Sequence, residues 1–233
     1  MSLGIDYFYR NHPLANIQAQ ASLKTRRKMY QWLVNKLGKV QNLKVLDHGS
    51  TPDTDRLDSN CFVKWFIEDG AETYAASPEI IDHLPQFIPK LKVIKWDLLD
   101  QSEIDFDLIM SSAVIEHVGT SRQQFLYIQK LLHYSRSVCL TTPNRYHWLE
   151  FHTKIPFLHW LPKKIHRTLL KILEFQFWAK EENLNLLSEK DIISLLDQLK
   201  RSGLNFVYDI YKPKFLGMVS NLVFLIRSVE VDQ

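Results

Sequence analysis

Apolar residues recur along the chain in two alternating patterns, one with the spacing of helices and one typical of buried strands. Residues 22–37 and 61–68 carry apolar side chains at helical spacing and are followed by Gly38 and Gly70. Short runs that are almost wholly apolar lie between helical segments, as in parallel strands buried on both faces. We therefore predict seven strands, at residues 43–46, 72–76, 91–96, 106–110, 138–142, 205–211 and 220–227.

Further helices are indicated by their end signals. Ser77-Pro78-Glu79 predicts a helix start, because proline suits the first helical position. Residues 121–134 have a helical pattern, and Ser188 with Asp191 resembles a capping box opening a helix that Gly203 ends. Because strands alternate with helices, we expect an α/β fold with a mostly parallel sheet and helices on both faces.

One long stretch departs from this alternation, between the fifth predicted strand and the capped helix. No internal repeat, low-complexity segment or linker divides the sequence, so we expect a single domain over residues 1–233. It contains an N-terminal helical segment, about 1–40, and an insert, about 144–185, which we expect to form a lid or a substrate-binding region.

Composition narrows the class of protein. The chain is 45% hydrophobic and 24% charged, which is ordinary for a soluble globular protein, and its formal charge of +3 is too small to indicate a nucleic-acid partner. The apolar run 215–226 has 12 residues, whereas a membrane-spanning helix needs roughly 20. Two widely separated cysteines and the lack of a signal peptide in the first ten residues predict a cytoplasmic protein.

Candidate binding residues follow the first predicted strand. Ligands of open parallel sheets bind beyond the carboxyl ends of the strands, where the strand order reverses. Asp47-His48-Gly49-Ser50 stands there, and Gly49 would let the backbone approach a ligand closely. An ordinary turn is the alternative. The dinucleotide pattern Gly-x-Gly-x-x-Gly is absent, which disfavours a nicotinamide or flavin enzyme.

Two later strand ends carry further polar residues. Asp97 follows the third predicted strand, where its carboxylate is suited to accept from an exocyclic amino group or to cap a turn. Glu116-His117 follows the fourth. Histidine titrates near neutral pH, so His117 is a candidate general base for a hydroxyl acceptor, or a structural residue.

Taken in order, these pieces resemble the motifs of class I S-adenosylmethionine (SAM)-dependent methyltransferases. The resemblance is closest to bacterial methyltransferase-domain proteins of the type 11 kind and covers roughly residues 40–227. Its core motifs are Leu46-Asp47-His48-Gly49, Asp97, Phe106-Asp107-Leu108-Ile109 and Val114-Ile115-Glu116-His117-Val118. Segments 142–145, 150–153, 156–162 and 182–186 look like those of one branch of the family.

The resemblance implies a Rossmann-like class I methyltransferase fold that binds SAM. The cofactor-binding residues implied in the first loop are Asp47, His48, Gly49 and Ser50, with Asp47 and Gly49 beside the methionine part. Asp97 and Leu98 would lie near the adenine. Ser111 and Ser112 would lie beneath the sulfonium.

The sequence departs from the family pattern at two places. Ser50-Thr51-Pro52 replace the later glycines of the first loop. The second strand ends in Ala75-Ala76-Ser77, where an acidic residue usually holds the ribose hydroxyls, and Glu79 would have to reach back to replace it. These departures support an alternative, a catalytically silent protein that uses the fold as a binding or membrane-docking module.

The insert supplies candidates for the acceptor end of the site. Glu150 and His152 stand two residues apart, so Glu150 is suited to orient a histidine that deprotonates a hydroxyl. A metal site of His147, Glu150 and His152 is conceivable, but the spacing matches no recognised zinc pattern and we predict no metal. A hydrogen-bonded loop pinned to the sheet is the structural alternative.

The segment 154–178 combines basic and apolar residues. From 154 to 171 it has five Lys or Arg and no acidic residue, interleaved with Phe, Trp, Leu and Ile. This composition suits peripheral contact with the inner membrane surface, an anionic acceptor, or a lid helix that packs its apolar side on the sheet.

Together these features predict a SAM-dependent methyltransferase acting on a small or lipid- or sugar-linked acceptor, most simply at an oxygen. The catalytic candidates are His117, His152 and Glu150. We expect no nucleic-acid partner, because no Asn-Pro-Pro-aromatic motif follows the fourth strand.

Overall fold

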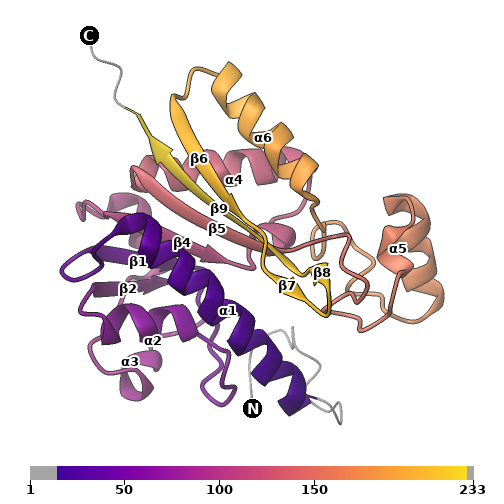
Figure 1. The fold of residues 1–233 in the computed structure, drawn as a ribbon, viewed down its shortest axis with the longest axis horizontal. Helices are drawn as coiled ribbons and strands as arrows, with labels where there is room; N and C mark the ends of the chain where they lie inside the picture. Colours follow the sequence, from indigo (N-terminus) through magenta and orange to yellow (C-terminus); the bar gives the residue numbers. More distant parts are fainter. Residues whose placement is uncertain (1–14, 230–233) are drawn as a thin grey trace.

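The computed structural model describes residues 15–229 and is built around one seven-stranded sheet (Figure 1). Its strand order is β3-β2-β1-β4-β5-β9-β6. The first five pair in parallel, and β9 runs antiparallel to both β5 and β6. The mostly parallel seven-stranded sheet predicted from the sequence is therefore confirmed. The strands are β1 (Lys44–His48), β2 (Glu72–Ala76), β3 (Lys92–Val93), β4 (Leu108–Ser112), β5 (Ser137–Pro143), β6 (Phe206–Tyr211) and β9 (Asn221–Ser228).

Helices cover both faces of this sheet, because successive strand residues alternate between two apolar cores. Val45 of β1 packs in one core with residues of α1 and α2, whereas Leu46 packs in the other with residues of α4 and α6. The longer helices are α1 (Ala15–Leu37), α2 (Cys61–Glu68), α4 (Ser121–Tyr134), α5 (Lys163–Ile172) and α6 (Glu189–Arg201). The shorter ones are α3 (Leu84–Phe87) and the 3-10 turns η1 (Trp96–Gln101), η2 (Ile115–His117) and η3 (Leu158–Trp160).

Three predicted boundaries were wrong. The third strand pairs only over β3, because the chain turns into η1 at Trp96 on the sheet edge. Ser77-Pro78-Glu79 begins no helix; the next helix is α3, which has Pro85 in its first turn. Helix α1 starts at Ala15 rather than at residue 22, and residues 1–14 of the predicted N-terminal segment lie outside the described residues.

The insert follows the carboxyl end of β5, and backbone hydrogen bonds hold both of its ends close to that strand end. Asn144 bridges to Leu187, and the Asn185 amide donates to the Glu116 carbonyl at 2.7 Å. The apolar run near the end forms β9 and a separate pair, β7 (Lys214–Phe215) and β8 (Met218–Val219). Within residues 15–229, no helix is both long and apolar enough to span a bilayer.

Helix α5 does not pack its apolar side on the sheet, as one interpretation of segment 154–178 required. Figure 1 shows α5 standing beside the sheet, and it packs mainly against η3. Its inward residues are His166 and Leu170, whereas Ile165 and Ile172 are 50% and 69% exposed. Two large apolar side chains of this helix are therefore exposed, whereas Leu170 is buried.

Candidate functional site

Strand β1 ends in a buried carboxylate. Asp47 points to the α1 face of the sheet and accepts a hydrogen bond from Ser50 Oγ. Burial raises the pKa of Asp47 to about 6, although the Ser50 hydrogen bond and the positive charge of Arg26 act to lower it. The carboxylate is thus poised to gain from a positively charged ligand, which would stabilise its ionised form.

Gly49 joins the carboxyl ends of three strands. Its φ of +101° is in the region that favours glycine, and its amide donates to the Ala76 carbonyl at 2.8 Å. A Cβ at this position would lie 2.5 Å from Cγ2 of Val114, in the loop after β4. Glycine is therefore required here both by backbone conformation and by the close approach of the neighbouring loop.

The side chain of His48 lies on the opposite face from that of Asp47. Its Nδ1 is 3.0 Å from the Tyr127 hydroxyl, and its ring lies 4.8 Å from that of Trp96. Burial lowers the pKa of His48 to about 4, so the ring is neutral at neutral pH. Because Nδ1 is engaged, the cofactor contact predicted for His48 would have to be made by its backbone or by Nε2. Nε2 has no hydrogen-bond partner among the described residues.

The two serines of β4 are engaged within the protein. Ser111 is buried with its Oγ 2.8 Å from the Tyr127 hydroxyl, and Ser112 Oγ accepts from Thr141 at 3.3 Å. Both lie at the carboxyl end of β4, next to the loop that contacts Gly49. The structure therefore places them at the predicted edge of the sheet.

The predicted adenine contacts lie on an open surface. Asp97 and Leu98 are in η1, and Leu98 is 47% exposed beside the partly exposed Trp96. Strand β2 ends without an acidic residue, as the sequence indicates. Glu79 lies three residues beyond β2, is half-buried, and has a pKa raised by that burial.

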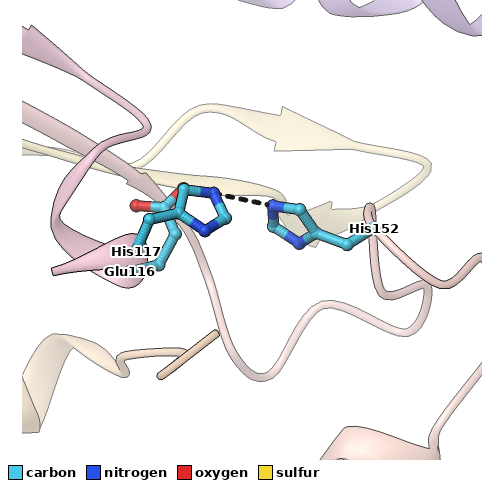
Figure 2. Close-up of side chains that lie close together, drawn as sticks. All are labelled: Glu116, His117 and His152. Atoms are coloured by element: carbon cyan, nitrogen blue, oxygen red, sulfur yellow. Dashed lines mark hydrogen bonds between the residues drawn. The ribbon is translucent and has the colours of Figure 1, made fainter. Parts of the chain in front are cut away.

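A second cluster joins η2 to the insert. Figure 2 shows His117 and His152 facing each other through their Nε2 atoms, which are 3.2 Å apart. His117 Nδ1 donates to the Asn183 carbonyl at 2.7 Å, and His152 Nδ1 lies 2.6 Å from Glu150. His117 of η2 is thus brought into contact with the Glu150–His152 pair of the insert.

Glu150 organises its own turn of the insert. Its carboxylate accepts from the His152 amide and ring, and from the amide and hydroxyl of Thr153, at 2.6–2.8 Å. Burial acts to raise the pKa of Glu150, but His152 and these hydrogen bonds hold it well below the usual range. Burial and the neighbouring His152 lower the pKa of His117 to about 3, so His117 alone is a weak base.

Glu116 is a site residue that the sequence analysis did not select as catalytic. It is fully buried and accepts from the Thr142 hydroxyl at 2.9 Å through Oε2, while Oε1 has no hydrogen-bond partner among the described residues. Burial raises the pKa of Glu116 to about 7. The adjacent Glu116-His117 pair was the available signal, but nothing in sequence shows that Glu116 faces inward.

His147 does not join this cluster. Its ring stacks on Phe151 at 5.0 Å, and its Nδ1 lies 3.1 Å from the Leu149 carbonyl. The trio of metal-binding type found within residues 15–229 is Glu116, His117 and His152, whose candidate ligand atoms all lie within 4.8 Å of one another. This trio shares only His152 with the set His147, Glu150 and His152 that the sequence suggested for a metal.

The fold is shared with methyltransferases of known structure. The chain is similar in structure to magnesium protoporphyrin IX methyltransferase from Synechocystis PCC 6803 with bound SAH, with a TM-score of 0.56 and 16% identity over 93% of this chain and 88% of that one. It is also similar to the plantazolicin methyltransferase BpumL in complex with SAH, with a TM-score of 0.56 and 12% identity over 95% and 88% of the two chains.

A cyclopropane-fatty-acyl-phospholipid synthase-like protein from Lactobacillus casei ATCC 334 is similar to the same degree. Its TM-score is 0.56, with 9% identity over 93% of this chain and 94% of that one. No known family and no curated protein matches the sequence itself. The comparisons thus establish the fold and leave the reaction of this chain to be argued from its residues.

Proposed function

We propose that this chain binds SAM at the carboxyl edge of the sheet and transfers its methyl group to an oxygen of a small or lipid- or sugar-linked acceptor. The observation that carries the proposal is the junction at Gly49, where the ends of β1, β2 and β4 meet beside the buried Asp47. Several proteins of this fold carry SAM or SAH, which supports the choice of cofactor.

The residues of the edge fit this cofactor. Asp47 would accept from the positively charged methionine part, and the backbone at Gly49 allows close approach. Leu98 and Asp97 would receive the adenine on an open apolar and acidic surface. Glu79 takes the place of the missing ribose acid, because its half-buried carboxylate would gain from accepting hydroxyl hydrogen bonds.

The cofactor supplies a methyl group already activated by positive sulfur. The protein therefore has to align the acceptor oxygen and, where it carries a proton, remove that proton. His117 and His152 would contact the acceptor, with Glu150 holding His152 in place. Ser111 and Ser112, at the carboxyl end of β4, would lie beneath the sulfonium, and η2 with His117 follows them in the chain.

The first test is thermal unfolding with millimolar SAM or SAH. Ligand at about 100 times its dissociation constant stabilises the native state by roughly 2.7 kcal/mol, which raises the Tm of a domain of this size by about 5–10 °C. Asp47→Asn should abolish most of the shift, whereas Asp105→Asn, on the surface, should retain it. A wild-type protein without a shift, confirmed by calorimetry, would contradict the proposal.

Catalytic roles are separated from binding by two further variants. His117→Ala and His152→Ala should lower turnover far more than cofactor affinity, because neither side chain lies at the cofactor loop. Unchanged turnover in both variants would exclude the histidines as acceptor-site residues while leaving SAM binding intact.

A second candidate function is a silent module that docks on anionic membranes, and the outward face of α5 favours it. Ile165 and Ile172 are exposed on a helix that carries Lys163, Lys164, Arg167 and Lys171 and no acidic residue. Apolar side chains flanked by basic ones suit the interface of an anionic bilayer, which attracts the charges and buries the apolar residues.

Vesicle co-sedimentation tests this candidate. We expect binding to vesicles of phosphatidylglycerol and not of phosphatidylcholine, weakened by salt. The double variant Ile165→Ser, Ile172→Ser should lose binding, whereas Val207→Ser, equally exposed on β6, should keep it. Vesicle binding without any SAM shift would favour the module, and binding to neither would exclude it.

A further inference from the structure

The two imidazoles of Figure 2 face each other through their Nε2 atoms, and their other nitrogens show where each ring carries its proton. The Asn183 carbonyl can only accept, so His117 carries its proton on Nδ1. The Glu150 carboxylate accepts from the His152 amide and from Thr153, so His152 likewise donates to it from Nδ1. Two neutral rings would therefore bring their unprotonated Nε2 atoms within 3.2 Å of each other, which is repulsive unless the two nitrogens share a proton or bind one metal ion.

Glu116 distinguishes the two cations. Its buried Oε1 has no hydrogen-bond partner among the described residues, and its carboxylate belongs to the same trio as the two rings. A shared proton would satisfy the two rings and leave this oxygen without a partner, which is costly in a buried site. A metal ion would engage all three groups at once.

Each group of the trio also has a hydrogen bond to a second protein group, as metal ligands usually have. His152 is backed by the Glu150 carboxylate and His117 by the Asn183 carbonyl, while Oε2 of Glu116 is held by Thr142. Partners of this kind fix the tautomer and the ring orientation of histidines that bind a metal. The cluster therefore has both the ligand atoms and the supporting hydrogen bonds of a metal site.

We propose that Glu116, His117 and His152 bind one divalent transition-metal ion, with Zn²⁺ the preferred probe. Two imidazoles and one carboxylate are a ligand set of catalytic zinc sites, whereas Mg²⁺ and Ca²⁺ prefer all-oxygen sites. Zinc–nitrogen bonds of about 2.0–2.1 Å in tetrahedral geometry put two ligand nitrogens ~3.3 Å apart, close to the 3.2 Å observed.

Such a site would leave one coordination position open. Three protein ligands are typical of zinc sites that also bind water or a substrate oxygen, and the metal lowers the pKa of that oxygen's proton. The ion would thus bind the acceptor at the end of β4. The proposal stands without the methyltransferase assignment, because metal binding needs neither cofactor nor acceptor.

The test uses full-length protein with any affinity tag removed and bound metal stripped by a chelator. Calorimetric titration with Zn²⁺ should give one ion per chain, and Mg²⁺ under the same conditions should give no binding. Glu116→Gln and His152→Gln should each weaken Zn²⁺ binding at least a hundredfold. Glu150→Gln, which removes only the support of His152, should weaken it about 10- to 100-fold.

The matched control is His133→Gln, an exposed histidine on α4 outside the cluster, which should bind Zn²⁺ like the wild type. Binding of Co²⁺ to wild-type protein, followed by its visible absorption, reports coordination without relying on variants that fold poorly. Absence of stoichiometric Zn²⁺ and Co²⁺ binding by the wild type would overturn the proposal. So would equal affinities of the wild type and both ligand variants.

Discussion

Above pH 6 the side chain of Asp47 is ionised, although its buried surroundings favour the protonated form. Its pKa of about 6 lies above that of an unfolded aspartate, so folding favours the protonated side chain. The resulting contribution to stability is fully present below about pH 4 and is lost as the pH rises through 6. At pH 8, Asp47→Asn should therefore be at least as stable as the wild type in thermal unfolding, while binding SAH more than tenfold more weakly.

The same residue sets the pH dependence of cofactor binding in the wild type. Only the ionised carboxylate attracts a positive ligand, so we expect SAH affinity to fall about tenfold between pH 7 and pH 5. Calorimetric titration across this range measures the effect, and Asp47→Asn should show a flat profile. A wild-type affinity that does not change below pH 6 would remove Asp47 from the cofactor site.

At the scale of elements, the turn after β5 depends on one carboxylate. Glu150 accepts four hydrogen bonds from His152 and Thr153, whereas an amide in its place would direct its NH₂ group at one of these donors. Glu150→Gln should cost about 2–4 kcal/mol of unfolding free energy in metal-free protein. Denaturant unfolding measures this, with Glu103→Gln on the surface as control. Equal stabilities would show that the turn is held elsewhere.

The elements themselves were largely predictable. All seven strands of the main sheet were anticipated, because each is an apolar run between turn residues, and the capping box at Ser188 and Asp191 is present. Helix α5 was harder, because periodicity shows that a helix has an apolar side and not which way that side faces. Strand β3 was overestimated, since its apolar residues continue past the last backbone pair at the sheet edge.

The cofactor edge and the histidine cluster differ in how far sequence determines them. Asp47, Gly49 and Ser111 directly follow or end strands, so the topology alone places them at one edge. His117 and His152 are brought together by an insert whose path no local pattern specifies. Their partner Glu116 was missed because no local pattern shows that its side chain faces inward, toward Thr142 of β5.

At the scale of the whole molecule, two ligands would act on different parts of the chain. A metal at Glu116, His117 and His152 joins η2 to the insert, whereas a cofactor at Gly49 acts on the loops after β1, β2 and β3. Backbone amides exchange with solvent through local opening, so each ligand should slow exchange mainly in the segments that it joins.

Hydrogen exchange followed by mass spectrometry measures this division. We expect Zn²⁺ to slow exchange in residues 115–119 and 150–153 together, and SAH to slow it in 47–60 and 77–98. Glu116→Gln should lose both effects of Zn²⁺ and keep those of SAH, because the Glu116 side chain hydrogen-bonds to Thr142 of β5 and its carbonyl to Asn185. Zn²⁺ protection confined to one of its two segments would place the ion elsewhere, since only a site that bridges η2 and the insert protects both.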